Sequence, residues 1–157
     1  MRRLQKITLI IAVIFVGLFA GCEILNLLSH DENIPRGYVD CVEYFDEEGF
    51  QDYVDYCWYQ YDSTEGAKLR SVYQEITDSE VSRVYGYFDN FRGWMEACNR
   101  MAQYDFDPSC INEGDSMLLF TKEGQHIGSA DYGKYDNYSL YFFDKEAARL
   151  YYIHSNI

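Results

Sequence analysis

The sequence predicts an α+β domain in which two to three helices are followed by a three-stranded antiparallel meander. Apolar residues recur at helical spacing in residues 47–61 and again in 77–98. After Pro108 the pattern changes to three short segments rich in aromatic and aliphatic residues. The chain has 157 residues, of which 48% are hydrophobic, and this is enough for one core.

The first helix is expected from about Glu47 to Tyr61, with Asp46 as its N-terminal cap. Its apolar face consists of Phe50, Tyr53, Val54, Cys57 and Tyr61. A shorter helical piece is expected from Ala67 to Glu75.

The second long helix has the clearest signals. Thr77 and Glu80 have the spacing of a capping box, in which each residue caps the other's backbone amide. A stripe of apolar residues then continues for about five turns. Its members are Val81, Val84, Tyr85, Phe88, Phe91, Met95 and Cys98.

Three strands are expected at Ser116–Thr121, Tyr138–Phe143 and Arg149–His154. The last two are joined by a connection of hairpin length, and the first two by the long segment Lys122–Asn137. Both faces of these strands carry apolar side chains. We therefore expect a sheet that is covered on one side and rich in tyrosine on the other.

The N-terminus has the layout of an export signal. Arg2, Arg3 and Lys6 precede an uncharged run that extends from Ile7 to Gly21. Such a signal predicts that the rest of the chain lies outside the cytoplasm, with the basic N-terminus inside.

The segment Leu18-Phe19-Ala20-Gly21-Cys22 resembles the cleavage box of bacterial prolipoproteins, although Phe19 stands where that family prefers an aliphatic residue. The resemblance implies that residues 1–21 are removed and that Cys22 carries a diacylglycerol. Residues 22–42 are then a lipid-anchored tether, and 43–157 a single globular domain. The alternative is an uncleaved membrane anchor that extends to about residue 28. The stretch 135–157 resembles small exported bacterial proteins without an assigned function.

The charge of the chain excludes some partners. The formal net charge is −13, and without the three basic residues of 1–21 the remainder has 26 acidic and 10 basic side chains, a charge of −16. Nucleic-acid binding depends on Lys and Arg, so no nucleic-acid partner is expected. Adsorption to anionic lipid is disfavoured as well, so attachment to a membrane needs the N-terminal anchor.

Four cysteines remain after Cys22, namely Cys41, Cys57, Cys98 and Cys110. An even number in an exported domain is compatible with two disulfides. Four buried thiols are the alternative. No pair has the CxxC spacing of a zinc or thioredoxin-type site.

No catalytic or cofactor motif stands out. The chain lacks a GxSxG elbow and a Gly-rich phosphate loop, and His30, His126 and His154 lack metal-ligand spacing. No metal or cofactor is therefore expected. We expect a non-catalytic binding module for a wall polymer, a peptide or a partner protein. An acidic inhibitor or immunity-type protein that blocks a basic site on a toxin or hydrolase is the alternative, and a secreted hydrolase is a third.

Tyrosine is unusually frequent, with 16 residues, and its amphipathic ring suits binding surfaces. The residues expected to contact a ligand are Tyr132, Tyr135, Tyr138 and Tyr141.

Overall fold

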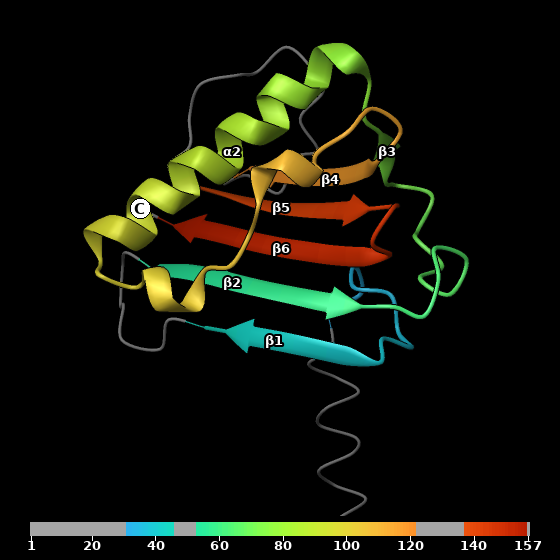
Figure 1. Ribbon diagram of the computed structural model, residues 1–157, viewed down its shortest axis with the longest axis horizontal. Coiled ribbons are helices and arrows are strands. Elements are labelled where there is room, and N and C mark those ends of the chain that lie inside the picture. The colour runs from blue at the N-terminus through green and yellow to red at the C-terminus, as the bar shows by residue number, and fades with distance from the viewer. Residues whose placement is uncertain (1–30, 46–52, 122–136, 157) are drawn as a thin grey trace, which may run out of the picture. The chain divides into compact units, whose positions relative to one another are not determined.

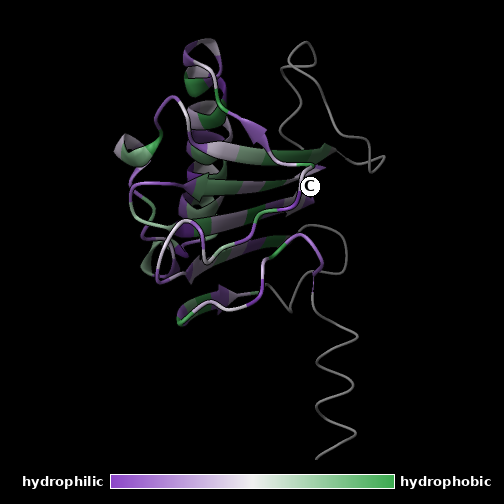
Figure 2. Ribbon diagram, turned by 90° about the vertical axis from the view of Figure 1, so that its right-hand side faces the viewer, coloured by the Kyte–Doolittle hydropathy of each residue, from purple (hydrophilic) through white to green (hydrophobic). Residues whose placement is uncertain are grey.

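The structure, a computed structural model, describes residues 31–45, 53–121 and 137–156. The chain divides into two units, Met1–Ile34 and Pro35–Ile157. In the first, Asp31 caps a turn by accepting a hydrogen bond from the amide of Asn33 at 2.8 Å. The second unit contains a six-stranded antiparallel sheet in the order β1-β2-β6-β5-β4-β3, which is visible from bottom to top in Figure 1. Helix α2 lies along one face of this sheet, as Figure 2 shows from the side.

The strands are β1 (Asp40–Tyr44), β2 (Tyr53–Gln60), β3 (Gln74–Glu75), β4 (Ser116–Thr121), β5 (Asn137–Asp144) and β6 (Arg149–Asn156). The helical elements of the described residues are α2 (Asp78–Ala97) and two 3-10 turns, η1 (Met101–Gln103) and η2 (Pro108–Cys110).

The predicted fold class, two to three helices followed by a three-stranded meander, is wrong. The described part of the chain is mainly a six-stranded sheet with one long helix. Three of the six strands, β1, β2 and β3, precede α2 in the chain. The predicted meander exists as β4, β5 and β6, but it is only half of the sheet.

The helix predicted for residues 47–61 is wrong where the structure describes it, because Tyr53–Gln60 is strand β2. Val54, Tyr56 and Trp58 belong to the core under α2, whereas Cys57 is buried on the opposite face. A strand that is buried on both faces has no alternation of polar and apolar residues, so helical spacing arises in it by chance. Aromatic and β-branched residues stabilise the extended form here.

The short helix predicted for Ala67–Glu75 is also wrong. Residues 64–67 form a turn, and Gln74–Glu75 pairs with β4 as the edge strand β3. At the other edge, β1 begins at Asp40 and pairs with β2 along its whole length. Its first residues fall within the segment 22–42 that was predicted to be a tether.

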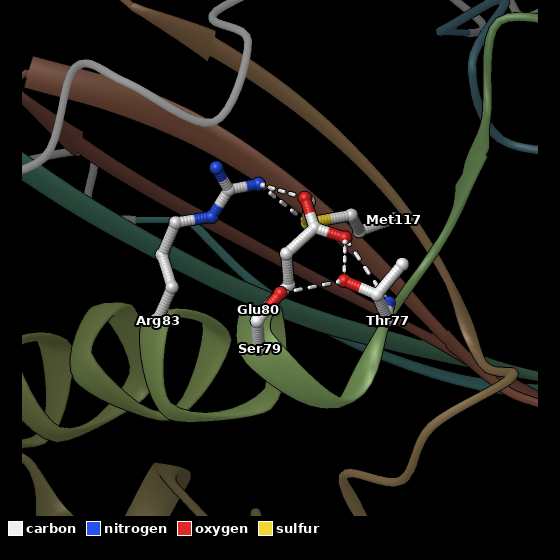
Figure 3. Close-up of polar contacts among 5 residues, drawn as sticks. All are labelled: Thr77, Ser79, Glu80, Arg83 and Met117. Atoms are coloured by element: carbon white, nitrogen blue, oxygen red, sulfur yellow. Dashed lines mark hydrogen bonds and ion pairs between the residues drawn. The ribbon is translucent and has the colours of Figure 1, made fainter.

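The helix predicted after Thr77 is confirmed as α2, including its capping box. Glu80 Oε2 accepts hydrogen bonds from the Thr77 backbone amide at 3.0 Å and from Thr77 Oγ1 at 2.8 Å (Figure 3). Glu80 Oε1 accepts a further bond from Arg83 at 3.2 Å. These contacts lower the pKa of Glu80, and the largest cause is the bond from the Thr77 amide. The carboxylate therefore fixes the first turn of α2 in its ionised form.

The core between α2 and the sheet is largely aromatic. Phe88 of α2 stacks on Phe106 with ring centroids 3.7 Å apart and meets Phe142 of β5 edge-on. Tyr104 donates a hydrogen bond to the Phe88 carbonyl at 3.2 Å, and Tyr56 donates one to Asp105 at 2.5 Å. The hydroxyls of Tyr56 and Tyr104 thus each have an acceptor, which removes the cost of burying them unpaired.

Candidate functional site

The face of the sheet opposite α2 carries two cross-strand rows of side chains, in which some residues are buried and others are partly exposed. In the first row His154 of β6 lies directly between Asp55 of β2 and Ser139 of β5, because both are its register partners. Phe120 of β4 continues this row as the partner of Ser139. Direct cross-strand partners share a face and have close Cβ atoms, so the four side chains are neighbours.

In the second row the rings of Tyr141 and Tyr152 pack against each other with centroids 4.7 Å apart. The Tyr141 ring also meets Phe120 edge-on at 6.2 Å. The Tyr152 ring is nearly parallel to His154, with an interplanar angle of 10°. We call the two rows the aromatic–polar patch. Its residues are Asp55, Phe120, Ser139, Tyr141, Tyr152 and His154.

A third row on the same face is covered by the chain itself. Tyr38 packs on Tyr59 with ring centroids 5.0 Å apart, and Tyr61 packs on Phe143 at 6.1 Å. The Tyr61 hydroxyl donates a hydrogen bond to the carbonyl of Pro35 at 2.6 Å, which holds the two covering segments together. Phe120, Ser139, Tyr152 and His154 of the patch remain half-buried, so solvent reaches part of each of them.

The polar part of the patch is ordered by one short contact. Ser139 Oγ and His154 Nδ1 lie 2.8 Å apart, a hydrogen-bond distance. Burial lowers the pKa of His154 below its usual value, and the Asp55 carboxylate and the Tyr138 backbone oppose this shift only in part. The imidazole is therefore neutral at neutral pH. A neutral imidazole has one nitrogen that donates and one that accepts, and here Nδ1 is already paired with Ser139 Oγ.

The structure does not bring the predicted ligand-contact tyrosines together. Tyr132 and Tyr135 lie outside the described residues. Tyr138 faces α2, is fully buried and donates a hydrogen bond to the Tyr87 carbonyl at 3.1 Å. Tyr141 lies on the opposite face, within the patch, and is 4% exposed.

The predicted lipid-attachment residue, Cys22, lies outside the described residues. Cys41, Cys57, Cys98 and Cys110 are free thiols in the structure. Cys57 is fully buried in the sheet, and burial raises its pKa to about 12. Cys110, at the end of η2, is half-buried, and its pKa is also raised to about 12 by burial. Both groups therefore stay protonated at neutral pH, and the disulfides remain a prediction.

No group of three or more His, Cys, Asp or Glu side chains among the described residues could hold a metal ion. No helix within residues 31–45, 53–121 and 137–156 is long and apolar enough to cross a membrane. The predicted signal or anchor, residues 1–28, lies outside these ranges.

Of the six patch residues, sequence reasoning expected only Tyr141 to contact a ligand. It missed Asp55, Phe120, Ser139, Tyr152 and His154. They come from four strands, and only the register brings them together. One signal was available in the sequence. Strand alternation places Tyr138 and Tyr141, three residues apart, on opposite faces, which excludes a single tyrosine surface containing both.

Comparison of the chain with protein-family models, curated proteins and solved structures finds no match.

Proposed function

We propose that this chain is a membrane-tethered, extracytoplasmic binding protein without catalytic activity, and that its aromatic–polar patch binds a cell-wall glycan. The observation that carries the proposal is the patch itself. Half-buried Tyr152 and Phe120 lie beside the hydrogen-bonded Ser139–His154 pair on a sheet face whose third row is covered by Tyr38 and Tyr61. The tether rests on the N-terminal segment that resembles a prolipoprotein signal, with Cys22 as the lipid site.

A sugar ring has an apolar face of C–H groups and an equatorial rim of hydroxyls. Aromatic rings such as Tyr152 offer a flat surface for the first. A hydroxyl has more than one hydrogen-bonding site, so Ser139 Oγ can pair with a sugar hydroxyl while it stays bonded to His154. A neutral imidazole suits this task because it needs no counter-charge on the ligand. The patch thus matches an uncharged polymer better than an anionic one, in keeping with the net charge of −13.

The Ser139–His154 pair also has the composition of a nucleophile and its base, so acyl transfer is the chemical alternative to binding. Acyl transfer needs backbone or side-chain N–H donors aimed at the developing oxyanion. Ser139 lies in β5, which is hydrogen-bonded to β4 on one side and to β6 on the other. The backbone amides around it are therefore used by the sheet, and this favours binding over acyl transfer.

The test is co-sedimentation of the full-length chain, in mild detergent, with purified wall sacculi, together with titration of soluble N-acetylglucosamine oligomers. Tyr152→Ala and His154→Ala are expected to weaken binding at least about tenfold, which corresponds to about 1.4 kcal/mol. Tyr85→Ala is the matched control, since Tyr85 is an exposed tyrosine of α2. Wild-type protein that binds neither ligand, or equal losses in the variants and the control, would refute the glycan site. Release of acetate or of free amino groups from the sacculi that disappears in Ser139→Ala would refute the non-catalytic role.

A further inference from the structure

The two edges of the sheet differ in how they are protected. At one edge β3 has only two residues, and its Glu75 forms an ion pair with Lys145 at 3.3 Å. A very short, charged edge strand offers little backbone for another strand to pair with. At the other edge β1 has five residues and pairs with β2 on one side only within the described part of the chain. Its outer side is therefore the longer row of backbone donors and acceptors for an incoming strand.

Exposed apolar side chains gather at this same edge. Among the described residues, five large hydrophobic side chains are notably exposed, and three of them lie in or next to β1. These are Val39, Val42 and Phe45, with 59%, 42% and 50% of their surface exposed. Val72 and Tyr85 are the other two and lie elsewhere in the chain. Apolar groups that concentrate on a free strand edge indicate a contact surface rather than scattered exposure.

The charge of the edge indicates what kind of strand fits it. Asp40 and Glu43 are exposed and belong to β1, which contains no basic residue. Glu43 Oε1 accepts a hydrogen bond from the Tyr59 hydroxyl at 2.9 Å, which holds the carboxylate in place at the edge. No Lys or Arg is paired with either carboxylate within the described residues. A second copy of the chain, with a net charge of −13, would bring like charges together.

We propose that the outer edge of β1 binds an extended, basic polypeptide segment of a partner protein by β-strand addition. Backbone hydrogen bonds to β1 would supply affinity, and alternate side chains would supply specificity. In β1, Val42 lies on the α2 side of the sheet as the register partner of Trp58, and Glu43 lies on the other side with Cys57. The partner segment therefore places an apolar residue opposite Val42 and basic residues opposite Asp40 and Glu43.

This surface is separate from the aromatic–polar patch and does not depend on glycan binding. The probe is the peptide acetyl-Thr-Val-Arg-Val-Thr-Lys-Thr-amide, whose antiparallel register sets Arg against Glu43, Val against Val42 and Lys against Asp40. Two control peptides accompany it. One has Glu in place of Arg and Lys, and the other carries N-methyl groups on alternate backbone nitrogens, which blocks strand pairing but keeps the side chains.

Binding is measured on the full-length chain by titration calorimetry and by amide shifts of residues 40–44 in NMR spectra. The basic peptide is expected to bind at least about tenfold more tightly than either control. Val42→Lys is expected to weaken its binding about tenfold. Val72→Lys is the matched control, because Val72 is 41% exposed and the substitution adds the same charge away from β1. Sedimentation velocity follows the oligomeric state of each variant.

Several results would overturn the proposal. Equal binding of the N-methylated peptide would show that side-chain contacts, and not backbone pairing, account for the binding. Equal binding of the acidic peptide would remove the charge argument. No binding of the basic peptide at millimolar concentration, or an equal loss in Val72→Lys, would also refute it. A dimer that dissociates in Val42→Lys would assign the edge to a second copy of the chain. Glycan binding of Val42→Lys, measured in parallel, separates failure here from failure of the proposed function.

Discussion

Raising the pH above 10 is expected to unfold the domain, because several of its buried tyrosines ionise only when they are released to water. Tyr56, Tyr59, Tyr61 and Tyr104 are each at most 8% exposed. The pKa of each is raised above the usual value, in every case chiefly by burial. For Tyr56 the hydrogen bond to Asp105 raises the pKa further, since the carboxylate would repel a tyrosinate.

The sign and size of the effect follow from proton linkage. An unfolded tyrosine has a pKa of about 10, and the folded pKa values lie higher, so above pH 10 the unfolded state holds fewer protons than the folded state. The stability contributed by each hydroxyl is complete below pH 10 and falls as the pH rises. At pH 11 each group has lost about 1.4 kcal/mol. The four together lose about 5–6 kcal/mol, which is comparable to the lower end of the stability of a small domain, about 5–15 kcal/mol.

The assay is a pH titration followed at 295 nm for tyrosinate and by near-ultraviolet circular dichroism for native packing. At least four tyrosinates are expected to appear together with the loss of the dichroism signal, between about pH 10.5 and 12. Tyr104→Phe is expected to reduce the slope of stability against pH by about 1.4 kcal/mol per pH unit. Tyr85→Phe, at an exposed position, should leave that slope unchanged. Titration of all tyrosines near pH 10 with the native dichroism signal intact would refute the reasoning.

Three substitutions test the packing and the ends of elements, each by urea denaturation. Phe88→Ala is expected to lower the free energy of unfolding by about 3–5 kcal/mol, because it opens a cavity beneath α2; a loss below about 1 kcal/mol would contradict the described core. Thr77→Ala should cost about 1 kcal/mol through the lost cap, whereas Ser82→Ala, at an exposed position within α2, should not. Gly93→Ala should raise stability by up to about 1 kcal/mol, because alanine favours the helix and a Cβ at this position meets no atom within 4 Å. Gly114→Ala should lower stability, because Gly114 has φ +89°, which disfavours a residue with a side chain. Equal effects of the two glycine changes would argue against the described backbone.

The elements that sequence reasoning predicted correctly have strong local signals. Helix α2 has a capping box at Thr77 and Glu80 and a continuous apolar stripe. Strands β5 and β6 are joined by a short turn in which Asp144 accepts hydrogen bonds from the amides of Glu146 and Ala147, both at 2.9 Å. Such signals lie within a few residues of each other, so one sequence suffices to detect them.

The elements that it missed depend on distant partners. Strand β2 is buried on both faces because α2 covers one side and Tyr38 covers part of the other. Its pairing with β6 sets Gln60 opposite Arg149, residues 89 positions apart in the chain. No local sequence pattern indicates this pairing of β2 with β6. The candidate site was missed for the same reason, because His154 meets Asp55 and Ser139 only through the registers of two strand pairs.

The central place of β6 in the sheet has a consequence for the order of assembly. The hairpin of β1 and β2 is made early during synthesis, yet the strand that joins it to β5 is the last of the six described strands. A hairpin alone is marginally stable in water, so the sheet closes only when residues 149–156 have emerged. Until then the β1–β2 hairpin lacks the strand that joins it to the rest of the sheet. For a protein exported as the N-terminal segment predicts, we expect this strand order to delay closure of the sheet until the whole domain has been synthesised.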